Sequence, residues 1–260
     1  DFIIDYPLVL IADTSFDITG KIIVKNDTKT GSIDSDAAAT PRALTLKASG
    51  GIEIQNGNFL GGTQPLSTIT VDSSLVLING SAFTSTTGTV FSSTGGTLSG
   101  SGTLAITGKL TNSGSWAFGT DISVTGDVTD TGSWDSSAGK EIIFNGMGAQ
   151  VFTPKASTTY SKITLNKSSG SFAGNASNEL KAGVFTITAC PQTVFNGVST
   201  FTSFANTPST TETITFANNA TINSAASFNR PVIISADARI ETSSGQTYNG
   251  TVTPGANVTF

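Results

Sequence analysis

The feature that most constrains the fold is an internal repeat of 18 residues around two tryptophans. The segment LTNSGSW at 110–116 recurs as VTDTGSW at 128–134, so Trp116 and Trp134 occupy equivalent positions. Self-similarity at a fixed spacing of this length is typical of a solenoid. In a solenoid each coil buries its apolar side chains only by packing against its neighbours.

Two further repeats lie near the C-terminus. Residues 228–240 align with 248–260 at a spacing of 20, and 211–222 align with 229–240 at a spacing of 18. The spacing is kept although the residue types differ, which indicates that the repeat preserves the positions that face the interior. We therefore expect stacked pairs in the core, namely Ile106 over Val124, Trp116 over Trp134, Ile214 over Val232, and Ala238 over Val258.

Short runs of alternating apolar and polar residues, each ended by Gly, Asn or Asp, fill most of the sequence. Examples are STITVDS at 67–73 and KITLNKS at 162–168. This period of two predicts strands, and no window gives a convincing helix. Because residue types recur every 18 to 20 positions, parallel stacking at about 4.8 Å is favoured over an antiparallel sandwich.

The sequence therefore predicts an all-β parallel β-helix (β-solenoid) with coils of about 18–20 residues. We expect one solenoid over residues 1–260, as a segment of a longer chain or as a fibre subunit. The period breaks near 27–42 and 59–67, where we expect irregular protruding loops. Loops are where an otherwise repetitive body would carry recognition.

The low charge content of the chain limits the classes of binding partner that we expect. Charged residues make up 12% of the chain, the net charge is −5, and Lys and Arg do not cluster. Nucleic acids and anionic lipids need a concentrated positive patch, so neither is expected as a partner. The apolar stretch at 2–12 is interrupted by Asp5 and Pro7 and is too short to span a bilayer, so no membrane insertion of this segment is expected.

The residue types that usually carry catalysis or bind metals are scarce. The chain has no His and a single Cys, so it forms no internal disulfide and lacks the commonest transition-metal ligand. Cys190 lies in an apolar run, which predicts a small buried side chain. We predict no enzymatic activity and no cofactor.

The acidic residues offer one weak candidate site. Asp34 and Asp36 are a weak calcium candidate within the expected loop, for which a solvated loop is the preferred interpretation. Asp130 lies where the earlier repeat copy has Asn112, which we interpret as exchange at a solvated turn position. The sequence therefore places no catalytic residue.

Asparagine recurs after an aromatic residue in FNG or YNG at 144–146, 195–197 and 248–250. Asn and Gly readily adopt a positive φ, so these segments suit coil corners. We expect their side chains to form structural hydrogen-bond ladders between coils.

Several segments resemble a known group of proteins. ALTLKASGGIEIQNGNFLGGTQPLSTITVDSSLVL at 43–77 and GQTYNGTVTPGANVTF at 245–260 resemble repeats of filamentous-haemagglutinin-like and other large secreted adhesins of Gram-negative bacteria. The segment at 140–172 is similar to a repeat of giant bacterial surface proteins. The resemblance implies a right-handed parallel β-helix, exported to the cell surface as an adhesin shaft or a fibre.

We therefore expect an extracellular structural or adhesive protein of a bacterial cell surface. Its expected partners are further copies of itself, in end-to-end or lateral assembly, or glycans and proteins of host or neighbouring cells. The alternative is a carbohydrate-active β-helix, a polysaccharide lyase or glycosidase, because parallel β-helices also serve these reactions.

Overall fold

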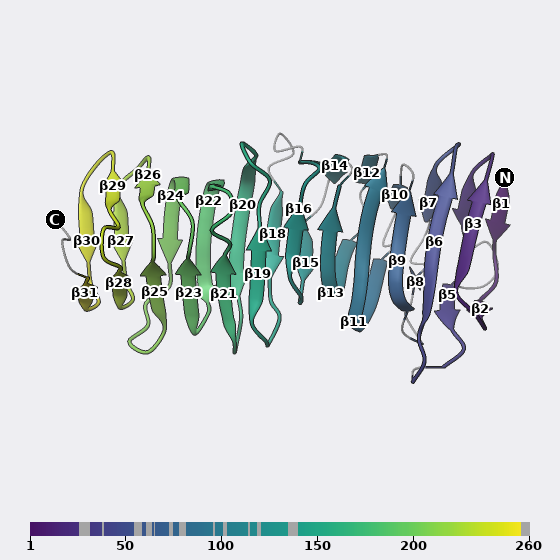
Figure 1. Cartoon of the computed structure of the whole chain (residues 1–260), viewed down its shortest axis with the longest axis horizontal. Helices are drawn as coiled ribbons and strands as arrows, with labels where there is room; N and C mark the ends of the chain where they lie inside the picture. The colour runs from purple at the N-terminus through teal and green to yellow at the C-terminus, as the bar shows by residue number, and fades with distance from the viewer. Residues whose placement is uncertain are drawn as a thin grey trace. The chain divides into compact units, whose positions relative to one another are not determined.

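The computed structural model shows an all-β chain in which parallel strands stack as a solenoid, as predicted (Figure 1). It describes residues 1–25, 32–37, 39–54, 59–60, 64, 66–72, 75–77, 82–95, 97–100, 103–113, 115–118, 121–134 and 140–255. Every secondary-structure element in these ranges is a strand. Among these residues, no helix has the length and apolar character needed to cross a membrane.

The chain divides into two compact units. The first contains Asp1–Gly126 with Asp130–Lys140, and the second contains Asp127–Thr129 with Glu141–Phe260. The prediction of a single solenoid over 1–260 stays a prediction. The strands of the first unit are β1 (Phe2–Ile4), β2 (Leu8–Leu10), β3 (Thr14–Ile18), β4 (Ile22–Val24), β5 (Ser32–Ser35), β6 (Arg42–Ala48), β7 (Ile52–Ile54), β8 (Phe59–Leu60), β9 (Leu66–Asp72), β10 (Leu75–Leu77), β11 (Ala82–Gly95), β12 (Thr97–Gly100), β13 (Thr103–Asn112), β14 (Ser115–Phe118), β15 (Ile122–Val124) and β17 (Ser133–Trp134).

The second unit continues the same architecture after β16 (Val128–Asp130), the strand at which the chain divides. Its strands are β18 (Glu141–Phe144), β19 (Gln150–Thr153), β20 (Thr159–Asn166), β21 (Ser171–Gly174), β22 (Leu180–Ala189), β23 (Gln192–Phe195), β24 (Ser199–Asn206), β25 (Thr213–Phe216), β26 (Ala220–Ile222), β27 (Ala226–Phe228), β28 (Val232–Ile234), β29 (Ile240–Thr242), β30 (Gln246–Tyr248) and β31 (Val252–Pro254).

Strand alternation determines which residues enter the core. In the first unit, β1, β4, β7, β10, β12, β14 and β17 form one parallel sheet. Ile22 and Val24 of β4 pair in register with Ile52 and Ile54 of β7, and all four are buried. The residue between each pair points outward, because successive strand side chains alternate between faces. The coils thus stack like residues on like.

The core of the second unit is rich in stacked phenylalanines. Phe185 of β22 is fully buried, and its ring centroid lies 5.2 Å from that of Phe195 and 5.0 Å from that of Phe201. Phe195 in turn stacks on Phe216 of the next coil at 5.1 Å. These centroid distances lie in the range of favourable aromatic pairs. An aromatic ladder therefore joins successive coils.

Three of the expected stacked pairs lie within the described strands. Ile106 pairs with Val124, Trp116 with Trp134, and Ile214 with Val232. Val124, Ile214 and Val232 are buried, whereas Trp134 is partly exposed. Ala238 is buried, but it lies in a turn, and Val258 lies outside the described residues.

The predicted coil length is wrong for one coil, and the predicted alignment of 211–222 with 229–240 shifts partway along. Ile22 pairs with Ile52, thirty residues on, so the second coil is longer than the expected 18 to 20. Near the C-terminus, the spacing of 18 holds where Ile214 pairs with Val232 but becomes 20 where Ala220 pairs with Ile240. The turn between β28 and β29, in which Asp237 has a φ of 65°, accommodates the two extra residues. Asp tolerates this left-handed conformation better than most residues.

The predicted loops also need correction. Within 27–42, Ser32–Ser35 forms β5, which pairs with β2 and β8. At the other segment, Phe59–Leu60 forms β8 and Leu66 begins β9. Residues 26–31, 38, 61–63 and 65 lie outside the described part of the chain. Both segments therefore contribute strands to the stack.

We expect Phe185→Ala to lower the free energy of unfolding by about 3–5 kcal/mol, because the change leaves a cavity among four aromatic neighbours. The measurement is urea unfolding of the full chain followed by circular dichroism. Val184→Ala on the outward side of the same strand is the matched control, with an expected loss below about 1 kcal/mol. Equal losses for the two variants would contradict this packing.

Candidate functional site

Both residues of the weak calcium candidate, Asp34 and Asp36, accept hydrogen bonds from other groups of the chain. Asp34 is buried in β5, where it accepts hydrogen bonds from the Ser32 hydroxyl at 2.9 Å and the backbone N–H of Gln64 at 3.3 Å. The Asp36 carboxylate accepts from Nε and Nη2 of Arg42 at 2.8 and 2.9 Å. These bonds hold the pKa of Asp36 below its usual value. The expected solvated loop is thus wrong for Asp34, and the described residues contain no group of three or more metal-ligating side chains.

Other acidic side chains bind the backbone of the adjacent coil. Asp13 accepts a hydrogen bond from the backbone N–H of Ala43 at 2.9 Å. Asp127 accepts one from the N–H of Val151 at 2.8 Å. The partners are 30 and 24 residues apart in the sequence, so each bond joins one coil to the next. These carboxylates act as structural acceptors.

Asp130 is a buried member of a polar ladder. Its carboxylate accepts from Nδ2 of Asn112 at 2.8 Å and from the N–H of Gly132 at 3.1 Å. Asn112 and Asp130 occupy equivalent positions of the tryptophan repeat, and both are buried. The interpretation as a solvated turn position is therefore wrong. When an aspartate stacks on an asparagine, the two side chains can hydrogen-bond to each other, because the amide donates and the carboxylate accepts.

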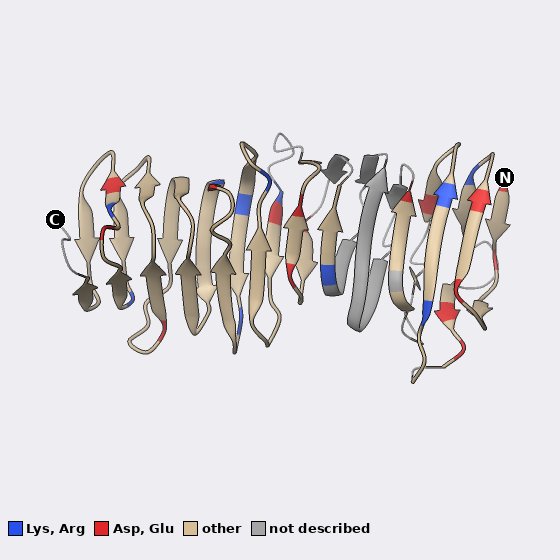
Figure 2. Ribbon diagram, viewed as in Figure 1, with Lys and Arg blue, Asp and Glu red and all other residues tan. Residues whose placement is uncertain are grey.

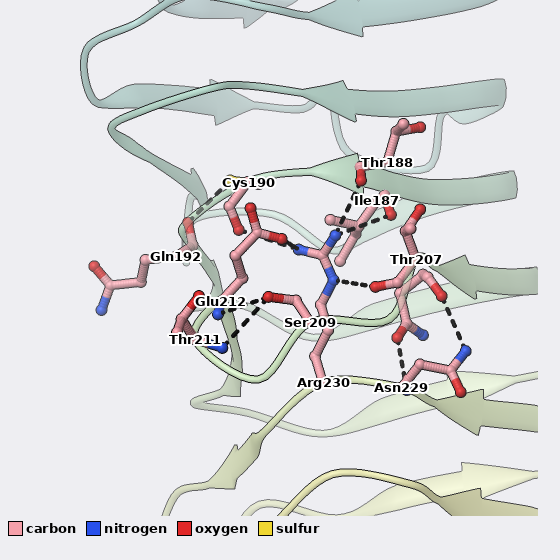
Figure 3. A network of polar contacts seen from close by, with 11 residues as sticks. Ile187, Thr188, Cys190, Gln192, Thr207, Ser209, Thr211, Glu212, Asn229 and Arg230 are labelled. Carbon is pink, nitrogen blue, oxygen red and sulfur yellow. Dashed lines mark hydrogen bonds and ion pairs between the residues drawn. The ribbon is translucent and has the colours of Figure 1, made fainter.

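A buried polar network of the second unit surrounds Arg230 (Figure 3). Its Nε donates to the carbonyl of Thr207 at 2.8 Å, and Nη1 donates to that of Cys190 at 3.2 Å. Nη2 donates to the carbonyl of Thr188 at 3.1 Å. Nη1 also lies 2.6 Å from Oε2 of Glu212, whose side chain is partly exposed. One guanidinium thus joins three successive coils.

The network compensates a buried charge. Burial lowers the pKa of Arg230, and the Glu212 carboxylate acts in the opposite direction. A buried cation is tolerated when it is paired and its donors are satisfied. The carbonyls of Cys190 and Thr207 lie just past the ends of β22 and β24, where a buried carbonyl needs another donor. Arg230 therefore donates hydrogen bonds to these carbonyls from the interior of the coil.

The same residues fix the loop between β24 and β25. The Ser209 hydroxyl oxygen accepts from the N–H groups of Thr211 and Glu212 at 3.4 and 3.1 Å. The backbone N–H of Ser209 donates to the carbonyl of Asn229 at 3.1 Å. The loop is thus held at its tip by the next coil and at its end by the ion pair to Arg230.

An asparagine ladder runs beside this loop. The amide of Asn229 donates from Nδ2 to the carbonyl of Asn206 at 3.0 Å, and its backbone N–H donates to Oδ1 of Asn206 at 2.7 Å. Asn249 donates from Nδ2 to Oδ1 of Asn229 at 2.7 Å. Asn249 belongs to the YNG segment, where the sequence predicted such a ladder.

Loop and ladder together border a groove of about 550 Å³. Its lining comes from 208–210, Asn229, Pro231 and 249–251, and it includes no charged side chain. Gly250 sits directly against the carbonyl of Arg230, where a Cβ would collide with the backbone. This glycine lets the last of the three segments approach the coil below. The groove is the candidate functional site.

A second buried cation has a similar structural environment. Nζ of Lys167 donates to the carbonyls of Gly146 and Gly148, the latter at 3.0 Å, and to Oε1 of Gln150 at 2.6 Å. Burial lowers the pKa of Lys167 and raises that of the Cys190 thiol. Cys190 is fully buried, as its apolar run predicted.

Sequence reasoning missed both buried cations. A signal existed for Arg230, since FNR at 228–230 replaces the FNG or YNG of other corners. Which carbonyls the guanidinium meets depends on coils up to about forty residues away, and a single sequence does not reveal them.

Comparisons with known proteins add no assignment. No protein-family model, curated protein or solved structure matches the chain. The resemblance to filamentous-haemagglutinin-like repeats is therefore supported only at the level of a β-solenoid repeat fold.

We expect Asp130→Ala to lower the free energy of unfolding by about 1–3 kcal/mol, because it leaves the buried Asn112 amide without this acceptor. Asp130→Asn keeps a side-chain carbonyl at the same place and should retain most of the stability. Thermal unfolding of the two variants and the unchanged chain checks this. A loss for Asn as large as that for Ala would contradict the ladder.

We expect Arg230→Met to lower the free energy of unfolding by about 3–5 kcal/mol, because Glu212 and several carbonyls lose their buried partner. The control is Arg239→Met, which breaks an exposed pair with Glu241 and should cost below about 1 kcal/mol. The measurement is urea unfolding by circular dichroism.

Cys190 supplies a second measurement for the same change, because its carbonyl accepts from Arg230 and its thiol is buried. In native conditions, Arg230→Met should speed the reaction of this thiol with a disulfide reagent. An unchanged reaction rate together with unchanged stability would contradict the role of the network.

Proposed function

We propose that the chain is an extracellular structural or adhesive protein of a bacterial cell surface, a rigid body serving as an adhesin shaft or a fibre-forming subunit. One observation carries the proposal: many of the described charged side chains bind neighbouring coils. Asp13, Asp127 and Asp130 accept bonds within the stack, and Arg230 and Lys167 donate to its corner carbonyls.

This use of polar groups favours a mechanical role. Main-chain hydrogen bonds, aromatic ladders and buried cations all act between coils, so they resist separation of one coil from the next. The mostly uncharged exterior then remains available for further copies, glycans or proteins. The resemblance of 43–77 and 245–260 to repeats of secreted adhesins supports a location at the bacterial cell surface.

The fold also suits a polysaccharide lyase or glycosidase. Glycoside hydrolysis generally needs two carboxylates flanking the scissile bond. The groove bordered by 208–210 and 249–251 includes no carboxylate in its lining, and Glu212 beside it is paired with Arg230. These observations favour the non-enzymatic function.

The proposal predicts surface labelling of the source bacterium. Antibodies raised against the purified chain should label intact cells in immunogold electron microscopy, with an antibody against a cytoplasmic protein as the control. Label confined to the cytoplasm would contradict the proposal. An immunoblot of the same cells distinguishes a fibre-forming subunit from an adhesin shaft. A fibre subunit should migrate at an apparent mass near that of the 260-residue chain, and a shaft at a far larger mass.

A further inference from the structure

The groove presents hydrogen-bonding groups toward solvent. Thr210 and Thr251 both line it and are exposed, and within the described residues neither hydroxyl has a hydrogen-bond partner. Asn249 uses its Nδ2 for Asn229, which leaves the carbonyl of an exposed amide directed to solvent or ligand. Pro208 and Pro231 add rigid apolar surface. The groove is thus polar, neutral and held in shape by the Arg230 network.

An uncharged face continues from the groove. We use this name for the outer surface of β19, β21, β23, β25, β28 and β31, strands that contain no charged residue (Figure 2). Pro231 and Thr251 of the groove directly precede β28 and β31. The outward residues at the middle of the six strands form one ladder: Val151, Ala173, Val194, Thr215, Ile233 and Thr253.

The dimensions of the uncharged face favour an extended ligand over a second protein. Six strands spaced about 4.8 Å apart give a strip roughly 25 Å long and about two residues wide. Its area is on the order of 250 Å², far below the roughly 800 Å² per partner of a stable protein interface. A single polymer chain lying across the coils would cover such a strip.

Charge selects the class of polymer. The chain carries a net charge of −5, and neither the groove nor the uncharged face contributes a cation. An acidic polymer would therefore meet repulsion without a compensating contact. A neutral polysaccharide suits both the groove and the uncharged face. Its hydroxyl groups can hydrogen-bond to Thr and Asn of the groove, and its ring faces can pack on the Val, Ile and Thr methyl groups of the uncharged face.

We propose that the groove and the uncharged face bind one chain of a neutral polysaccharide that runs across successive coils. This inference rests on the proposed adhesive function and names the ligand class of its surface. The groove holds the chain by hydrogen bonds from Thr210 and Thr251. The uncharged face extends the contact, with one coil spacing comparable to the length of one pyranose unit.

The test is co-sedimentation of the full chain with microcrystalline cellulose, chitin and insoluble mannan. We expect binding to at least one of them, unaffected by added sodium chloride. Thr210→Ala combined with Thr251→Ala should weaken that binding about tenfold, as expected for the loss of two hydrogen bonds. The matched control combines Thr202→Ala with Thr221→Ala, two threonines of β24 and β26 outside the groove.

Circular dichroism and thermal unfolding establish that both double variants are folded. Binding to none of the three polysaccharides would overturn the inference, as would equal binding by the two double variants. Binding that added sodium chloride abolishes would also overturn it, because contacts between neutral groups do not depend on salt. Surface labelling of cells is measured separately, so the ligand class can fail while the proposed location stands.

Discussion

In-register hydrogen bonding between successive coils is the constraint on which the rest of the structure depends. Because strand side chains alternate between two faces, a slip of one residue would move a whole apolar set from the core to solvent. Register therefore puts Ile52 over Ile22 and Phe216 over Phe195, and it equally determines the outward rows. The uncharged face of the second unit is a consequence of the same pairing that forms the core.

Polar side chains provide hydrogen-bond donors for backbone carbonyls at the coil corners. Where the chain turns, carbonyls leave the ladder and still need donors when they are buried. Arg230 and Lys167 supply these donors from within, and Asn229 supplies one to the carbonyl of Asn206 at the edge of the groove. These charged and amide side chains therefore hold the coils together, and we propose that recognition falls to the neutral groups on the outer surface.

The sequence predicted the fold class because alternation and repeats are local signals that every coil presents. It failed for β5 because SIDS lacks apolar alternation, and the strand forms through pairing with β2 and β8. It misread Asp130 because the exchange with Asn112 looks like surface drift, although the two side chains bond to each other. It did not find the Arg230 network because its partners come from distant coils, which no local pattern reveals.

Engineered disulfides test the in-register stacking most directly. In a Cys190→Ser background, Thr164→Cys with Thr186→Cys joins register partners of β20 and β22, whose Cα atoms lie about 4.8 Å apart. Thr164→Cys with Val184→Cys is offset by two residues, at about 8 Å and beyond disulfide reach. Thiol titration after mild oxidation should show cross-linking of the first pair and not of the second. Equal cross-linking, or preference for the offset pair, would contradict the account.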